Sequence, residues 1–137
     1  MTRLQTAHTR DGRRLEASHV LSVPAADAWD LLVDTARWPD WAPLVTGVEA
    51  TERRIQLGTT GHVLVSGVWV PFRITDYSDS DRRWSWCVAG VPAATHRVEA
   101  LTADRCRVIF ELPVHAVGSA PISLRALERL ESVLDAD

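Results

Sequence analysis

The segment from residue 29 to residue 45, WDLLVDTARWPDWAPLV, constrains the fold of this chain more than any other. It contains three of the six tryptophans, and its prolines, Pro39 and Pro43, rule out one long helix. A residue before a proline is disfavoured in helical geometry, so we expect a break at Trp38 and a bent pair of short helices. We expect this pair to act as a lid, whose rings close over a hollow that holds a small, largely apolar molecule.

The rest of the chain reads as one antiparallel sheet followed by a helix. Apolar and polar residues alternate along residues 15–23, and residues 25–32 have the spacing of an amphipathic helix. From Val45 onward the pattern is typical of short strands and tight turns. The expected elements there are a hairpin at 61–77 that turns at Ser66-Gly67, strands at 83–88, 94–101 and 105–114, and a helix at 120–135.

Composition and charge narrow the class of protein. A chain of 137 residues with 46% hydrophobic and 24% charged residues fits one ordinary globular domain. Its net charge of -3 gives no electrostatic attraction to nucleic acid, and no apolar run reaches the roughly 20 residues that cross a bilayer. The polar start of the chain does not resemble a signal peptide. We therefore expect a cytoplasmic protein with no nucleic-acid partner and no stable membrane insertion.

The sequence offers no pattern for a metal or a cofactor. Cys87 and Cys106 are isolated and lack a Cys-x-x-Cys spacing, which is typical of reduced, packed thiols. The five histidines are far apart and share no ligand spacing. No nucleophile motif and no glycine-rich phosphate loop is visible. We expect no bound metal and no cofactor.

Two histidines are candidates for the polar part of the expected cavity. His19 lies on the apolar face of the first strand, and His96 shares a face with Ala94, Val98 and Ala100. Each has two readings: a histidine hydrogen-bonded within the core, or a neutral imidazole that projects into the cavity and contacts a ligand oxygen. The strand spacing would place the two imidazoles roughly 10 Å apart, which suits a pair that brackets a small ligand.

Large side chains supply the expected walls of the cavity. Trp84 and Trp86 project from one strand face, and this spacing allows either core packing or contact with an apolar ligand. Trp38 and Trp41 on the lid have the same two readings. Arg73 is a candidate for pairing with a ligand carboxylate or enolate, with a solvated strand arginine as the alternative. The full set of candidate ligand-binding residues is His19, Trp38, Trp41, Trp69, Arg73, Tyr77, Trp84, Trp86, His96, Phe110 and Leu127.

Several motifs, in this order along the chain, resemble one known superfamily. They are VPAADAWDLL at 23–32, DTARWPDW at 34–41, Leu57-Gly58, RITDY at 73–77 and RWSW at 83–86. Together they are similar to the START-like (SRPBCC) superfamily, and within it to the polyketide cyclase/dehydrase and lipid-transport families. The likeness covers roughly residues 14–135, which is almost the whole chain.

The resemblance implies an α+β helix-grip fold, in which a seven-stranded antiparallel sheet wraps around the C-terminal helix and two short helices follow the first strand. A cavity would open between helix and sheet. It also implies a single START-like domain at residues 14–137, preceded by an N-terminal tail at 1–13. The terminal helix is expected to be short, about four turns. That would leave a more open cavity, or an apolar strip that a second subunit covers in a homodimer.

The superfamily hosts several functions on one scaffold, so three hypotheses stay open. The first is binding or carriage of a small hydrophobic, lipid- or polyketide-like molecule in the cavity. The second is a polyketide cyclase, aromatase or dehydratase, in which His19 or His96 moves a proton and Arg73 or Tyr77 stabilises an enolate. The third is a protein-interaction module, marked by an exposed apolar patch and a cavity well under roughly 300 Å³. The sequence leaves open whether any reaction is catalysed.

Overall fold

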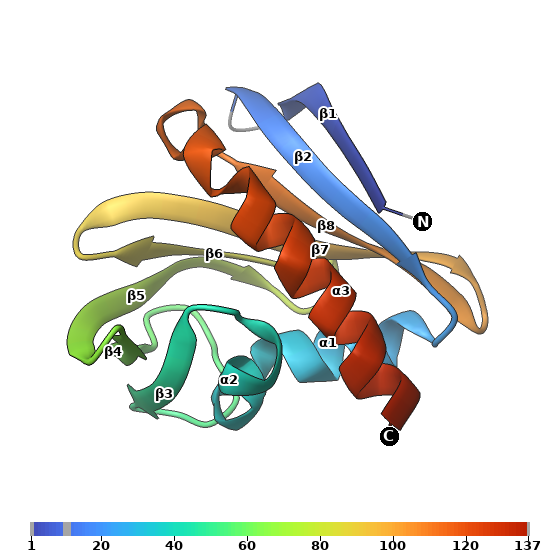
Figure 1. Cartoon of the computed structure of the whole chain (residues 1–137). Coiled ribbons are helices and arrows are strands. Elements are labelled where there is room, and N and C mark those ends of the chain that lie inside the picture. Colours follow the sequence, from blue (N-terminus) through green and yellow to red (C-terminus); the bar gives the residue numbers. More distant parts are fainter. Residues whose placement is uncertain (1, 10–11, 137) are drawn as a thin grey trace.

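Eight antiparallel strands form one curved sheet in a computed structural model, which describes residues 2–9 and 12–136 (Figure 1). Neighbouring strands follow the order β1-β2-β8-β7-β6-β5-β4-β3. The strands are β1 (Thr2–Thr9), β2 (Gly12–Leu21), β3 (Val45–Ala50), β4 (Thr60–Val65), β5 (Val68–Ser78), β6 (Arg83–Val88), β7 (Val91–Thr102) and β8 (Arg105–Leu112). The helical segments are α1 (Ala25–Val33), η1 (Thr35–Arg37), α2 (Trp38–Trp41), η2 (Val114–Ser119) and α3 (Ala120–Ala136).

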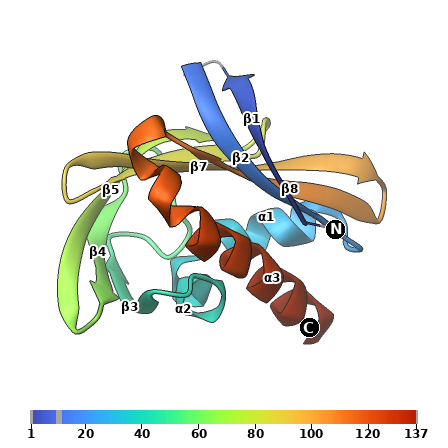
Figure 2. The ribbon, with the colours of Figure 1, turned by 45° about the horizontal axis from the view of Figure 1, so that its top comes forward.

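The C-terminal helix α3 crosses the hollow face of the sheet, and α1 and α2 lie beside it (Figures 1 and 2). The apolar stripe of α3 explains this position, because Leu127 and Leu130 are buried whereas Glu128 and Ser132 face solvent. The molecule therefore has the expected helix-grip α+β architecture, with an antiparallel sheet and a C-terminal helix.

The sheet has eight strands where seven were expected, and the additional strand is β1, within residues expected to form a tail. β1 pairs with β2 along its whole length, from Thr2 opposite His19 to Thr9 opposite Gly12. It is an edge strand with most of its side chains exposed, so it does not need an apolar face. Alternation of apolar and polar residues is the main sequence signal of a strand, and the polar sequence of β1 lacks it.

The lid breaks at Asp34, whereas the sequence predicted a break at Trp38. Asp34 is extended (φ -91°, ψ 104°), and its carboxylate accepts hydrogen bonds from the Ala36 amide at 3.0 Å and from Arg53 at 2.9 and 3.0 Å. The hydrogen bond from Arg53 is the main reason that the pKa of Asp34 lies below its usual value. Trp38 is helical (φ -54°, ψ -41°), because Pro39 falls in the first turn of α2, where its missing N–H costs nothing. The lid thus has three pieces, α1, η1 and α2.

The hairpin of β4 and β5 turns at Ser66 and Gly67, as predicted. Both residues have positive φ, 49° and 78°, which matches the mirror-image turns that two-residue hairpins favour. Pro71 stays in register with β4, and the irregularity in β5 comes after Ile74 instead. That bulge shifts the alternation by one residue, so Tyr77 falls on the inner face with Ile74, whereas strict alternation predicts that it shares the face of Arg73.

The outer face of the sheet carries a buried network of ion pairs. Glu111 is only 1% exposed, and it accepts hydrogen bonds from Arg97 at 2.7 Å and from Arg83 at 3.3 Å. Arg97 also pairs with Glu16 at 3.0 Å, and Arg83 lies 3.5 Å from Asp76. Because β2, β5, β6, β7 and β8 each contribute one of these groups, the network joins five strands of the sheet.

Candidate functional site

A cavity of about 440 Å³ lies between the sheet and the N-terminal half of α3. The helix α2 and the loop before β3 close one side, and strands β3 to β8 supply the floor. Among the lining residues that the structure describes there is no aspartate, glutamate, lysine or arginine. Small-molecule sites in proteins usually have volumes of roughly 300–1,000 Å³ and mostly apolar walls, so this cavity has the size and character of such a site.

The cavity reaches the surface between the α2–β3 loop and the first turn of α3. Leu44 and Ile122 line the cavity and are also 49% and 38% exposed. Ala116, in η2, and Ala93, near the start of β7, complete this rim and are half-buried. The rim is therefore apolar, which gives an apolar molecule a continuous path from the surface into the cavity.

The floor of the cavity is an aromatic cluster centred on His96. The imidazole stacks on the ring of Trp84 at a centroid distance of 3.9 Å, and Phe110 meets it edge-on at 4.8 Å. Trp38, from the lid, stacks on Trp84 at 5.4 Å with an interplanar angle of 5°. Trp86 meets Trp84 edge-on at 5.6 Å. Three consecutive strands, β6, β7 and β8, and the distant helix α2 thus bring their rings to one wall.

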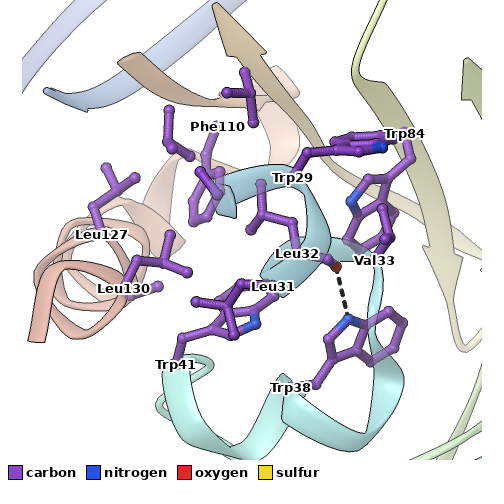
Figure 3. Close-up of a cluster of buried hydrophobic side chains, with 14 of the residues drawn as sticks. Trp29, Leu31, Leu32, Val33, Trp38, Trp41, Trp84, Phe110, Leu127 and Leu130 are labelled. Atoms are coloured by element: carbon purple, nitrogen blue, oxygen red, sulfur yellow. Dashed lines mark hydrogen bonds between the residues drawn. The ribbon is translucent and has the colours of Figure 1, made fainter. Parts of the chain in front are cut away.

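The two tryptophans of α2 have different partners in the same wall, and Figure 3 shows both beneath α1. The indole N–H of Trp38 donates to the Leu32 carbonyl at 2.9 Å, as the dashed line in Figure 3 marks. That carbonyl lies in the last turn of α1, where a helix leaves its acceptors without helical partners. Trp41 packs instead against Phe110 at 5.9 Å and His96 at 6.2 Å. Trp38 therefore fixes α2 to the end of α1 within the lid, and Trp41 packs the lid against side chains of β7 and β8.

Among the described residues on the cavity wall, His96 alone has a titratable side chain, and it is buried. Burial disfavours its charged form and lowers its pKa to about 3, while an interaction with the Trp84 backbone works in the opposite direction. The imidazole is therefore neutral at physiological pH. Its Nδ1 has no hydrogen-bond partner among the described residues, nor have the indole nitrogens of Trp41, Trp84 and Trp86. These four nitrogens are enclosed by neighbouring rings.

Two serines add hydroxyl groups to the cavity wall on the helical side. Ser119 donates to the Ala116 carbonyl at 2.6 Å, so its hydrogen is already used. Ser123 lies four residues further along, in the first turn of α3, and is buried. The hydrophobic stripe of α3 predicted that the helix packs on the sheet. A second row, formed by Ser119, Ile122, Ser123 and Ala126 at helical spacing, faces the cavity, and sequence reasoning missed it although its period is visible.

Six of the predicted ligand-binding residues line the cavity: Trp38, Trp41, Trp84, Trp86, His96 and Phe110. Leu127 does not, because it is fully buried in the core, where Figure 3 shows it on α3 beside Leu130. Trp69 and Arg73 point to the outer side of β5 and are exposed. Tyr77 packs against Trp29 at 5.8 Å and donates a hydrogen bond to Asp79 at 3.1 Å, beyond the cavity wall.

His19 also lies outside the cavity, although it shares the inner face of the sheet with His96. Its Nδ1 is 2.6 Å from the Thr2 hydroxyl, and its Nε2 is 2.8 Å from a carboxylate oxygen of Glu131 in the C-terminal half of α3. The cavity touches only the N-terminal half of that helix. The two histidines therefore do not bracket a common space, and His19 joins β1, β2 and α3.

Two general features bear on the class of site. Within residues 2–9 and 12–136 no cluster of three or more histidine, cysteine, aspartate or glutamate side chains is arranged to hold a metal ion. In the same part of the chain no helix is both long and apolar enough to span a membrane.

Solved structures share this fold at low sequence identity. XoxI from Bacillus cereus is 18% identical with a TM-score of 0.69, over 90% of this chain and 96% of its own. The Zhui aromatase/cyclase from Streptomyces sp. R1128 is 14% identical with a TM-score of 0.68, over 97% of this chain and 94% of its own. A START superfamily protein from Mycobacterium smegmatis is 14% identical with a TM-score of 0.59, over 90% and 94%. No curated protein matches the sequence significantly.

The family comparison covers nearly the whole chain. The model of the family described as polyketide cyclase / dehydrase and lipid transport matches residues 13–135, from β2 to the end of α3. It includes every residue that lines the cavity. The chain therefore belongs to the polyketide cyclase/dehydrase and lipid-transport family.

Proposed function

We propose that this protein binds and carries a small hydrophobic molecule in the cavity between α3 and the sheet. The observation that carries the proposal is the wall itself: about 440 Å³ enclosed by aliphatic and aromatic side chains, with no charged residue among them. An apolar molecule that enters such a space leaves water and gains contact with the rings of Trp84 and Trp86. The family assignment supports the same kind of function, because its description includes lipid transport.

A polyketide cyclase, aromatase or dehydratase is the second candidate, favoured by the family description and by the likeness to the Zhui aromatase/cyclase. The residues considered for proton transfer fit it less well. His96 lines the cavity, but an imidazole with a pKa of about 3 is a weak base near pH 7. His19, Arg73 and Tyr77 lie away from the cavity wall. Any acceleration would then come mainly from holding a flexible substrate in its reactive shape.

A protein-interaction role is supported less than ligand binding. That hypothesis is associated with a cavity well under roughly 300 Å³, and this one is larger. The exposed apolar side chains near the cavity, Leu44 and Ile122, also line it, so a ligand path accounts for their position.

Blocking the rim tests the binding proposal. We expect Ala116→Trp to weaken the binding of an apolar probe, 2-methylnaphthalene, by at least about 10-fold in isothermal titration calorimetry, because the new ring fills the entrance. Ala103→Trp, which adds the same ring to the exposed β7–β8 turn, is the matched control and should bind like the wild type. Ala94→Phe provides a second block from the sheet side, in case Ala116→Trp alters η2.

Native mass spectrometry of the purified protein completes the test, since a carrier should retain a small molecule that Ala116→Trp loses. Equal binding of the probe by wild type, Ala116→Trp and Ala94→Phe would show that the probe does not enter the cavity. The absence of any binding by the wild type would refute the carrier function.

A further inference from the structure

The polar atoms around the cavity differ in whether a ligand can reach them. The indole nitrogens of Trp41, Trp84 and Trp86 and the Nδ1 of His96 are enclosed and have no exposed surface. Trp38 uses its N–H on the Leu32 carbonyl. A ligand could therefore pair with these ring nitrogens only if the aromatic wall were to rearrange.

The two serine hydroxyls on the cavity wall also differ in whether a ligand can form a hydrogen bond with them. Ser119 is already bonded, with its hydroxyl donating to the Ala116 carbonyl at 2.6 Å. Ser123 lines the cavity and is 8% exposed, and its hydroxyl makes no hydrogen bond to any residue in the described ranges 2–9 and 12–136. Its Oγ is also not among the enclosed polar atoms without partners. Ser123 therefore holds an available hydroxyl on the helical side of a mostly apolar wall.

Charge sets a second condition on what can bind. The lining has no arginine or lysine to pair with an anion, and His96 stays neutral because it is buried. Moving a carboxylate from water into such a space without a cationic partner is strongly unfavourable, whereas one hydroxyl or carbonyl oxygen requires only one hydrogen bond. A ligand whose single oxygen lies near Ser123 can form that one hydrogen bond.

We propose that Ser123 determines the specificity of the cavity by forming the hydrogen bond to the ligand, so that the protein takes uncharged ring compounds with one oxygen and rejects the corresponding carboxylates. This inference rests on the proposed binding function. In the bound state the ring system lies against the aromatic wall of β6 and β7, and the oxygen points to α3. The hydroxyl of Ser123 can donate to a carbonyl oxygen or accept from a ligand hydroxyl.

Three naphthalene probes test the inference by calorimetry at pH 7: 2-naphthol, 2-methylnaphthalene and 2-naphthoate. We expect Ser123→Ala to weaken the binding of 2-naphthol by about 3- to 10-fold, which is the effect of one hydrogen bond. The affinity for 2-methylnaphthalene should stay within about 2-fold of the wild-type value. Ser123→Thr keeps a hydroxyl and should restore most of the affinity for 2-naphthol. Ser132→Ala removes a hydroxyl from the exposed face of the same helix and should change neither probe. We expect 2-naphthoate to bind the wild type at least about 30-fold more weakly than 2-naphthol.

The outcomes separate the two proposals. If 2-methylnaphthalene binds but Ser123→Ala affects both uncharged probes alike, or neither, Ser123 does not determine specificity and the carrier function stands. If 2-naphthoate binds as tightly as 2-naphthol, the rejection of anions is wrong. If none of the probes binds the wild type, both the carrier function and this inference are refuted. An alanine at position 123 favours the helix, so loss of folding is not an expected cause of any change.

Discussion

Replacing His96 by phenylalanine should change how the stability of this protein depends on pH. The imidazole has an ordinary pKa of 6.5 and a folded-state pKa of about 3, because it is buried. Below pH 6.5 the unfolded chain therefore binds a proton that the folded chain does not, and the wild type loses stability as the pH falls. Above pH 6.5 both states are neutral at this position and the contribution vanishes.

The size of the effect follows from the two pKa values. With 6.5 in the unfolded chain and about 3 in the folded one, the wild type loses about 2 kcal/mol of unfolding free energy between pH 7 and pH 5 through this group alone. The slope approaches about 1.4 kcal/mol per pH unit below pH 6 and ends near pH 3. His96→Phe keeps a ring against Trp84 but has no group that binds a proton. Between pH 7 and pH 5 it should therefore lose less unfolding free energy than the wild type, and the difference should be about 2 kcal/mol.

Urea unfolding followed by circular dichroism at pH 7, 6 and 5 measures the difference. Phe110→Leu is the control, because it alters the same aromatic wall without removing a titratable group, and its curve should run parallel to that of the wild type. Parallel curves for His96→Phe and the wild type would refute the reasoning. They would mean that His96 is protonated in the folded protein, and it would then become a credible acid for the cyclase hypothesis.

Two further variants test the lid and the outer face, each by urea unfolding. Trp38→Phe should lower the unfolding free energy by about 1–3 kcal/mol, because the Leu32 carbonyl loses its donor in a buried place, whereas Trp69→Phe, at a 44% exposed ring, should change it by less than about 0.5 kcal/mol. Glu111→Gln should cost about 3–5 kcal/mol by removing the buried carboxylate that pairs with Arg97, and a loss below 1 kcal/mol would contradict this account of the network.

Much of the fold could be predicted from periodicity. The alternation in residues 83–88 placed Trp84 and Trp86 on one inner face, and the prolines of the lid placed Trp38 and Trp41 over the sheet, and all four line the cavity. The position of the turn at Ser66-Gly67 was readable in the same way. These signals are local: each depends on residues within a few positions of one another.

Other features depend on contacts between distant segments. The break at Asp34 is stabilised by the guanidinium of Arg53, which lies 19 residues later in the chain. The face of Tyr77 depends on a bulge that is set by the pairing of β5 with β6. The strand β1 exists through its backbone pairing with β2, and its polar sequence carries no sign of it.

The sequence by itself determined most of the order of elements, the family and the shared face of Trp84 and Trp86, because burial leaves a regular period along the chain. Only the tertiary structure decided which inward-facing residues meet empty space. His19 and His96 both point inward from neighbouring parts of one sheet, but α3 covers the first with Glu131 and leaves the second beside the cavity. Periodicity reports that a side chain is buried, whereas the volume left unfilled depends on how separate elements pack together.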